Sequence, residues 1–152
     1  MSTKTIATNR RARFDFEIVE TVEAGIVLLG SEVKSLRNGR ADLKDSYAAV
    51  TKGELWLHGL RISPYEFAQD GGHDPERDRK LLLHRLEIDK IGAKLAERGL
   101  TLIPIKLYFK DGKAKVELGL GKGKSKYDKR ETLKRRQADR EMQRAIRHKS
   151  ID

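Results

Sequence analysis

Short runs of hydrophobic residues, several of them alternating with polar residues, recur along the first 120 positions of the chain. In the run that starts at Phe14, apolar side chains alternate with Asp15 and Glu17, which is the period of a half-buried strand. Turns separate the runs, among them those predicted at Ala24-Gly25 and Lys52-Gly53, and the pair Asp111-Gly112 is the strongest hairpin signal. The pattern predicts strands at 14–18, 26–29, 47–50, 55–62, 100–109 and 114–120.

Two segments have the spacing of helices instead. A short helix is predicted from Ser31 to the turn at Asn38-Gly39, and a longer one over 80–98, ending at Gly99. The element order is then β-β-α-β-β-α-β-β, with Pro104 predicting a bulge or an edge in its strand. Short strands with few helices favour a mainly β fold. We expect a small closed barrel of the oligonucleotide-binding (OB-like) type with flanking helices.

The last 32 residues differ in composition from the rest. From Gly121 to Asp152 there are twelve basic and five acidic residues, a net +7 of the total +10. Such a segment cannot bury enough apolar surface to fold alone. We therefore predict a barrel domain at 1–121 and a basic tail at 122–152 that is disordered when free and helical when bound. Alternating glycines at 119, 121 and 123 are interpreted as a flexible hinge between the two.

Composition restricts the function further. The 152-residue chain has a pI near 9.9 and no cysteine, which excludes disulfides and thiolate metal sites. A basic protein of this kind attracts polyanions, above all nucleic acid. No apolar run approaches the ~20 residues that span a bilayer, so we expect a cytoplasmic protein that does not bind a membrane.

Signals for catalysis are weak. Gly123-Lys124-Ser125 resembles the end of a phosphate-binding loop, but Leu118 stands where that motif needs glycine. The four histidines have no metal-ligand spacing. Asp15 and Glu17 would lie on one strand face and leave open a metal-dependent nuclease. We expect a protein that is not an enzyme and has no cofactor and no metal.

Signals for RNA binding are stronger. Residues 9–13 form a basic group before the first predicted strand, and Lys34 and Arg37 are three apart on the short helix, so they share a face. Glu32 on the same helix could accept hydrogen bonds from base amino groups, or could instead stabilise the helix dipole. Tyr127 is an aromatic residue in the basic tail and is suited to stacking on a base.

Several motifs in order resemble the SsrA-binding protein (small protein B) family of bacteria. They are Asn9-Arg-Arg-Ala-Arg13, Gly30-Ser-Glu-Val-Lys-Ser-Leu-Arg37, Asp45-Ser-Tyr47, His73-Asp-Pro-Glu-Arg-Asp-Arg-Lys-Leu-Leu-Leu83, Lys106-Leu-Tyr108, Gly121-Lys-Gly-Lys124 and Tyr127-Asp-Lys-Arg130. The resemblance implies an OB-like barrel that binds transfer-messenger RNA (tmRNA) and brings it to stalled ribosomes in trans-translation. It further implies that the protein substitutes for a missing anticodon arm, and that alanylated tmRNA arrives with elongation factor Tu.

The resemblance also implies roles for particular residues. The tmRNA-binding group would comprise Asn9, Arg11, Glu32, Lys34, Arg37, Lys122 and Lys124. The tail would enter the decoding centre and the empty message channel of the small subunit with Tyr127, Asp128, Lys129, Arg130 and Lys134. We expect a monomer. The alternative is a general RNA-binding or ribosome-associated protein with the same barrel and no role with tmRNA.

Overall fold

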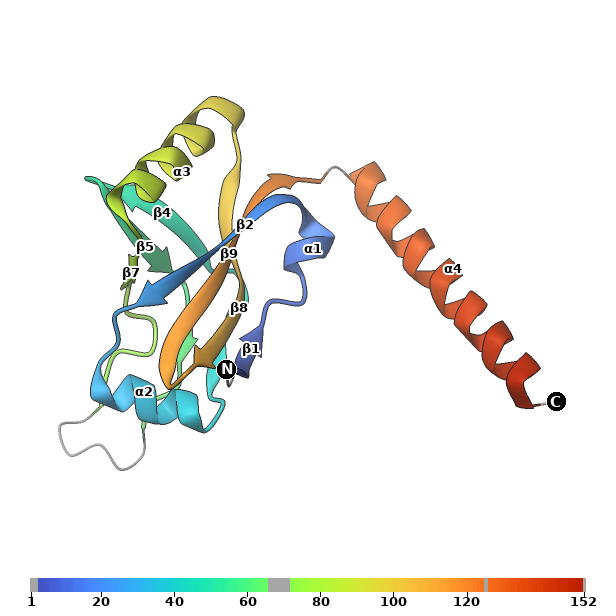
Figure 1. Ribbon diagram of the computed structural model, residues 1–152, viewed down its shortest axis with the longest axis horizontal. Helices are drawn as coiled ribbons and strands as arrows, with labels where there is room; N and C mark the ends of the chain where they lie inside the picture. The colour runs from blue at the N-terminus through green and yellow to red at the C-terminus, as the bar shows by residue number, and fades with distance from the viewer. Residues whose placement is uncertain (1–2, 66–71, 125, 152) are drawn as a thin grey trace.

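The computed structural model describes residues 3–65, 72–124 and 126–151. Its elements are nine strands and four helices within these ranges (Figure 1). In chain order they are β1 (Thr3–Thr8), α1 (Ala12–Asp15), β2 (Phe16–Ile26), α2 (Gly30–Arg37), β3 (Ala41–Asp42), β4 (Tyr47–Thr51), β5 (Glu54–His58), β6 (Arg61–Ile62), β7 (Arg79–Leu82), α3 (Arg85–Arg98), β8 (Thr101–Lys110), β9 (Lys113–Gly123) and α4 (Lys126–Ile151).

Six of the strands close a ring through antiparallel pairs. The order runs β4-β5-β7-β2-β9-β8, and β8 returns to β4 through the pair Ala48 and Leu102. The second half of β8, from Lys106 to Lys110, pairs with β1, which lies outside the ring. The predicted mainly β, closed OB-like barrel with flanking helices is confirmed. The small sheet of β3 and β6 lies beside it.

The inside of the ring holds the hydrophobic core. Side chains from facing strands are fully buried there, among them Leu55, Leu57, Leu107, Val116 and Leu118. Burying a side chain of this size contributes about 1.5–3 kcal/mol each, so the core holds the barrel together. Ile88 and Ile91 of α3 are also buried and belong to the same core, as their helical spacing predicted. No helix within the described ranges is long and apolar enough to cross a membrane.

Two predicted turns are confirmed. Lys52 and Gly53, at φ 52° and 76°, join β4 to β5, and Asp111 and Gly112, at 51° and 80°, join β8 to β9. Two consecutive residues with positive φ make the tight turn that suits the strand twist of a hairpin. The bulge expected at Pro104 is present as a shift in the β8–β9 register.

Several predicted boundaries are wrong. Asp15 ends the four-residue α1 and the strand begins only at Phe16, so Asp15 and Glu17 do not share a strand face. No turn occurs at Ala24-Gly25, because β2 runs through it to Ile26 and keeps its pairs with β7 and β9. The first residues of the predicted long helix form β7, and α3 starts at Arg85. Strand β1 was not predicted.

The glycine hinge is also a wrong prediction for two of its three residues. Gly119 and Gly121 lie within β9, where a Cβ on Gly121 would stand 2.9 Å from the Cβ of Phe16. One on Gly119 would stand 2.6 Å from Cδ1 of Ile105. Glycine at these positions therefore permits close packing, and only Gly123 has open space around it.

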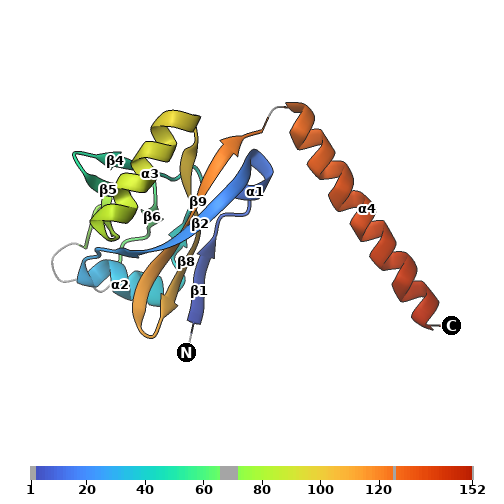
Figure 2. The same ribbon diagram turned by 45° about the horizontal axis from the view of Figure 1, so that its top comes forward.

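The basic C-terminal segment is helical in the structure. Helix α4 leaves the end of β9 and runs away from the barrel (Figures 1 and 2). The guanidinium of Arg136, in the third turn of this helix, lies 5.9 Å from the ring centroid of Phe14 in α1. The domain division at 121/122 and the disorder of the free tail stay predictions.

Candidate nucleic-acid interface

Helix α2 presents two cations to solvent. The residues Glu32, Ser35 and Leu36 are buried against the barrel, which leaves Lys34 and Arg37 on the exposed side. The Nζ of Lys34 lies 5.5 Å from the ring centroid of Tyr65, a favourable cation–π contact. Lys34 and Arg37 thus have the exposure that phosphate binding requires, as predicted from their spacing.

Glu32 does not have that exposure. Its side chain is 0% exposed, and its carboxylate accepts hydrogen bonds from Arg77 at 2.6 Å, from Arg79 at 2.6 Å and from the Leu29 backbone N–H at 2.8 Å. Burial alone would raise the pKa of Glu32, but these hydrogen bonds and the charge of Arg79 outweigh it and hold the pKa below its usual value. The carboxylate is thus enclosed and occupied by donors of the chain itself, and its contact with a base stays a prediction.

Arg77 and Arg79 were missed as site residues. Arg79 is 0% exposed, and beyond Glu32 it donates to the carbonyl oxygens of Leu60 at 2.5 Å and Pro75 at 3.3 Å. Leu60 and Pro75, on either side of β6 in the chain, are thereby tied to α2. Nothing in local spacing predicts a pair separated by 45 and 47 positions, so this network follows only from the tertiary fold.

His73 adds a further link to the same helix. Its Nδ1 lies 2.9 Å from Oγ of Ser31, and its Nε2 lies 2.9 Å from the carbonyl oxygen of Ile62. Both ring nitrogens are therefore used in the structure. No group of three or more histidine, aspartate or glutamate side chains that could hold a metal ion occurs within the described part of the chain.

The residues before α1 form a second polar group. The Asn9 side chain donates from Nδ2 to the carbonyl oxygen of Pro104 at 3.0 Å, and its backbone N–H donates to Ile105 at 2.7 Å. Arg11 forms an ion pair with Asp15 at 3.5 Å and lies over the ring of Phe14 at 5.1 Å. Asn9 thus holds the end of β1 in place, while the Arg11 side chain remains 65% exposed.

Lys122 and Lys124 have different environments. Lys122 is exposed at the end of β9. Lys124 donates its backbone N–H to the carbonyl oxygen of Asp15 at 2.9 Å and its Nζ to that of Arg13 at 3.0 Å. These bonds satisfy the carbonyl end of α1, which is where a cation is electrostatically favoured. Lys124 therefore joins the tail to α1, and Lys122 is the better candidate for an RNA contact.

The predicted tail residues fall in the first turns of α4. Arg130 and Lys134 are exposed there. The predictions for Tyr127, Asp128 and Lys129 concern side chains that lie outside the described part of the structure. They belong to α4 by their backbone.

A third basic group lies on the outer face of the β8–β9 hairpin and was not predicted. The Tyr108 hydroxyl donates to Glu23, and Lys106 lies 5.4 Å from the ring centroid of Tyr108. The hydrogen bond from Tyr108 lowers the pKa of Glu23, and burial together with Glu23 raises the pKa of Tyr108. Lys110 pairs with Glu23 at 3.6 Å, so this carboxylate organises the surrounding cations.

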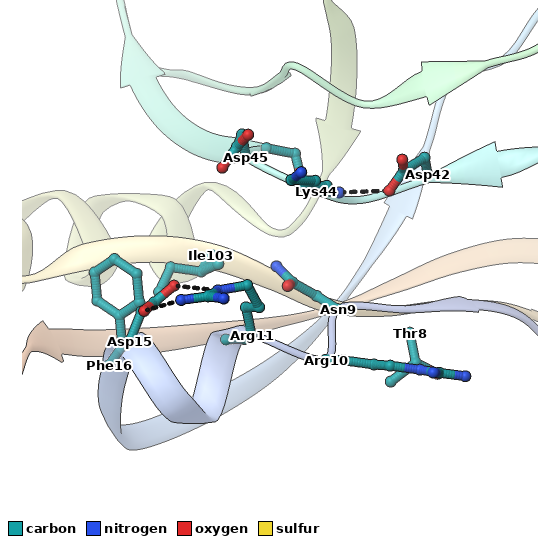
Figure 3. A pocket seen from close by; sticks show the side chains of 12 residues that line it. Thr8, Asn9, Arg10, Arg11, Asp15, Phe16, Asp42, Lys44, Asp45 and Ile103 are labelled. Atoms are coloured by element: carbon teal, nitrogen blue, oxygen red, sulfur yellow. Dashed lines mark hydrogen bonds and ion pairs between the residues drawn. The ribbon is translucent and has the colours of Figure 1, made fainter. Parts of the chain in front are cut away.

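Among the predicted tmRNA-binding residues, Arg37 lies near the start of β1, and Asn9 and Arg11 lie at its end. Lys4 and Thr5 at its start line a hollow of about 260 Å³ together with Arg37 of α2. Asn9 to Ala12 at its end line a pocket of about 270 Å³ between α1 and the β3–β4 loop (Figure 3). A strand of six residues spans roughly 20 Å, so a large RNA surface could cover both groups but a single base could not.

Comparison with known proteins identifies the family of the chain. The family model described as SmpB protein matches residues 6–148. An SsrA-binding protein of Geobacillus thermodenitrificans (strain NG80-2) is 59% identical over 146 residues, covering 96% of this chain and 94% of the relative. That of Syntrophobacter fumaroxidans (strain DSM 10017 / MPOB) is 60% identical over 142 residues, covering 93% and 88%.

A solved structure gives the same result in three dimensions. It was described as "tmRNA-SmpB: a journey to the center of the bacterial ribosome", and its matching chain has a TM-score of 0.67 and 50% sequence identity. The match covers 84% of this chain and 93% of that chain. The barrel, the order of the motifs and these relatives together lead to one assignment: the chain belongs to the SmpB protein family.

Proposed function

We propose that the protein binds tmRNA and delivers it to stalled ribosomes, so that trans-translation can release them. The observation that carries this proposal is the likeness, over most of both chains, to a protein seen with tmRNA in the ribosome. The exposed cations on α2, around α1 and along α4 support it, because neutralising phosphates releases counterions and drives RNA binding.

The two parts of the molecule would divide the work. The barrel binds the tRNA-like domain of tmRNA, with Lys34, Arg37, Arg11 and Lys122 among the exposed contacts. Helix α4 substitutes, together with the barrel, for the missing anticodon arm and enters the decoding centre and the message channel. The net +7 of the tail supports this placement, since the channel walls are RNA.

The cellular setting follows from the same proposal. The protein acts in the cytoplasm as a monomer, in a complex that includes elongation factor Tu and alanylated tmRNA. It supplies no catalytic step and needs no cofactor. The nuclease alternative loses its geometric basis, because Asp15 ends α1 and forms an ion pair with Arg11. RNA that stays intact after incubation with the protein and Mg²⁺ would exclude it.

A truncated chain ending at Lys126 tests the division of work. It keeps β9 and the Lys124 bonds to α1, so we expect the barrel and its tmRNA affinity to be preserved. Peptide tagging of stalled products should be lost, because the cations of α4 are gone. Gel-shift titration with tmRNA and a reconstituted tagging reaction measure the two effects, and equal loss of both would contradict the division.

A further inference from the structure

The pocket at the end of β1 has two walls of different origin (Figure 3). One wall is the β1–α1 segment with Asn9 and Arg11, and the opposite wall is the end of β3 with Asp42 and the following loop with Lys44 and Asp45. Its volume of about 270 Å³ is just below the roughly 300–1,000 Å³ of pockets that enclose drug-sized ligands. It has room for one flat, polar group rather than for a helix or a strand.

The floor of the pocket is apolar. Ile103 and Ala12 are only 3% and 2% exposed, and Phe16 packs against them. Beside this floor, the planar guanidinium of Arg11 is held by two hydrogen bonds to Asp15. Apolar side chains and fixed guanidinium planes are the surfaces on which unpaired bases stack in proteins that bind single-stranded RNA.

The charges of the lining argue against a phosphate in the pocket. Asp15, Asp42 and Asp45 offset Arg10, Arg11 and Lys44, so the pocket has no net positive charge. A phosphate group would meet three carboxylates at close range, and like charges repel strongly in a partly enclosed site. A neutral ligand with hydrogen-bond donors suits the lining better.

Hydrogen-bond acceptors with unused capacity line the rim. The Asn9 amide uses Nδ2 on Pro104, which leaves its Oδ1 as an acceptor. Asp42 accepts the Lys44 backbone N–H with Oδ1 only, and among the described residues Asp45 has no hydrogen-bond partner. In Figure 3 the Asn9 side chain points across the pocket toward the wall that carries the two aspartates.

We propose that this pocket receives a single unpaired guanine base of RNA, an inference that rests on the proposed function as an RNA-binding protein. Guanine presents an N–H and an amino group side by side on its Watson–Crick edge. These two donors match the two oxygens of the Asp45 carboxylate. Adenine and cytosine place an acceptor next to their amino group, and uracil lacks the amino group. Lys44 and Arg10 at the rim then face the flanking phosphates.

Short single-stranded RNAs test the proposal on the full chain. NMR titration compares the pentanucleotide UUGUU with UUUUU, UUAUU and UUCUU, following the Asn9 side-chain amide and the Ile103 methyl group. We expect UUGUU to shift both signals and to bind at least about fivefold more tightly than UUUUU. This factor corresponds to the lower bound of about 1 kcal/mol for a bidentate base contact.

The variant Asp45→Asn should reduce that preference to near the UUUUU level, since the carboxylate is lost. Asn tolerates the positive φ of 61° at this position, and spectral dispersion reports that the fold is intact. Asp111→Asn is the matched control, because it makes the same change at a φ of 51° in the distant β8–β9 turn. It should leave the guanine preference unchanged.

Three results would overturn the proposal: equal affinity for all four pentanucleotides, tighter binding of UUAUU or UUCUU, or equal effects of the two variants. Wild-type binding to tmRNA, measured in parallel, distinguishes failure of the guanine pocket from failure of the proposed tmRNA-binding function. A protein that binds tmRNA while the Asn9 and Ile103 signals stay still refutes the guanine pocket alone. A protein that fails to bind tmRNA while UUGUU shifts these signals refutes the proposed function alone.

Discussion

Glu32 holds α2 in place through partners that arrive much later in the chain. Arg77 and Arg79 both donate to its carboxylate, and the pair of Arg79 with Glu32 is 0% exposed on each side. Removing one partner of such a pair leaves a buried charge without compensation, which costs far more than the pair contributes as a whole. Glu32 therefore acts on Lys34 and Arg37 indirectly, by fixing the helix that carries them.

We predict that Glu32→Gln lowers the free energy of unfolding by about 3–5 kcal/mol at pH 7. The folded-state pKa of Glu32 lies below its unfolded value. Its contribution is therefore present above the unfolded pKa and disappears as the pH falls through the folded one. The difference between wild type and variant should shrink below about pH 4.3. Urea unfolding at a series of pH values measures it.

Glu54→Gln is the control for this variant. Its pair with Lys80 is 3.5 Å long, and both side chains are more than 40% exposed. Exposed pairs contribute only ~0–1 kcal/mol, so this change should have little effect on stability. Similar losses in the two variants would show that Glu32 is not a structural anchor.

The site could be predicted only as far as side chains act locally. Exposed Lys34 and Arg37 follow from helical spacing, and the charge of Arg130 and Lys134 follows from tail composition. The buried state of Glu32 and the bonds of Lys124 to α1 could not be predicted. They depend on residues 45 and 111 positions away, and no local period carries that information.

Among the elements, β9 shows why glycines near a tail need not form a hinge. Gly119 and Gly121 let Ile105, Ile18, Ile103 and Phe16 approach the strand closely, and the strand stays paired with β2 as far as Gly123. The absent side chains are thus part of the packing between neighbouring strands.

We predict that Gly121→Ala destabilises the barrel by about 1–3 kcal/mol, the usual cost of an extra methyl group in a packed core. Its Cβ would meet the Cβ of Phe16, which can move only with its backbone. Gly123→Ala makes the same change where nothing lies within 4 Å and should stay within about 0.5 kcal/mol of wild type. Thermal unfolding compares them, and equal effects would restore the hinge interpretation.

Element prediction succeeded where turn chemistry and period agreed, as in the hairpins at Lys52-Gly53 and Asp111-Gly112. It failed at Phe14, because α1 is too short to show a helical period and its residues happen to alternate. It also failed at β7, whose Leu81 falls in phase with the apolar face of α3. In both cases the secondary structure is set by strand pairing with distant parts of the chain, β2 with β9 and β7 with β5 and β2.

At the scale of the whole molecule, α4 carries a row of arginines along its length. Arg136, Arg140 and Arg144 follow one another at intervals of four residues and are all exposed, so they form a stripe along the helix. The opposite side bears Ala138, Met142 and Ile146. A helix of this kind can lay a row of charges along RNA phosphates.

We predict that replacing Arg136, Arg140 and Arg144 together by Gln weakens ribosome binding and reduces its salt dependence. The slope of log K against log salt concentration should fall in magnitude by about 2–3, because three phosphates are no longer neutralised. Barrel stability should change by no more than about 1 kcal/mol, because these side chains are exposed and Arg136 contributes one exposed cation–π contact with Phe14. Binding titrations from low to high salt measure the slope, and an unchanged slope would place these arginines away from phosphates.

The attachment of β1 has a consequence for the native-state dynamics of the protein. The ring closes without β1, through the contact of Ala48 with Leu102, and within the described ranges β1 pairs only with the second half of β8. It can therefore open in a local unfolding step that leaves the barrel closed, and its amide hydrogens should exchange at a lower free energy than those of β8 and β9. Asn9 would leave with β1, while Ile103 stays in the ring. A ligand that contacts both Asn9 and Ile103 must therefore also slow the exchange of the β1 amide hydrogens. Occupancy of the pocket and local unfolding of the N-terminal strand are thus thermodynamically linked.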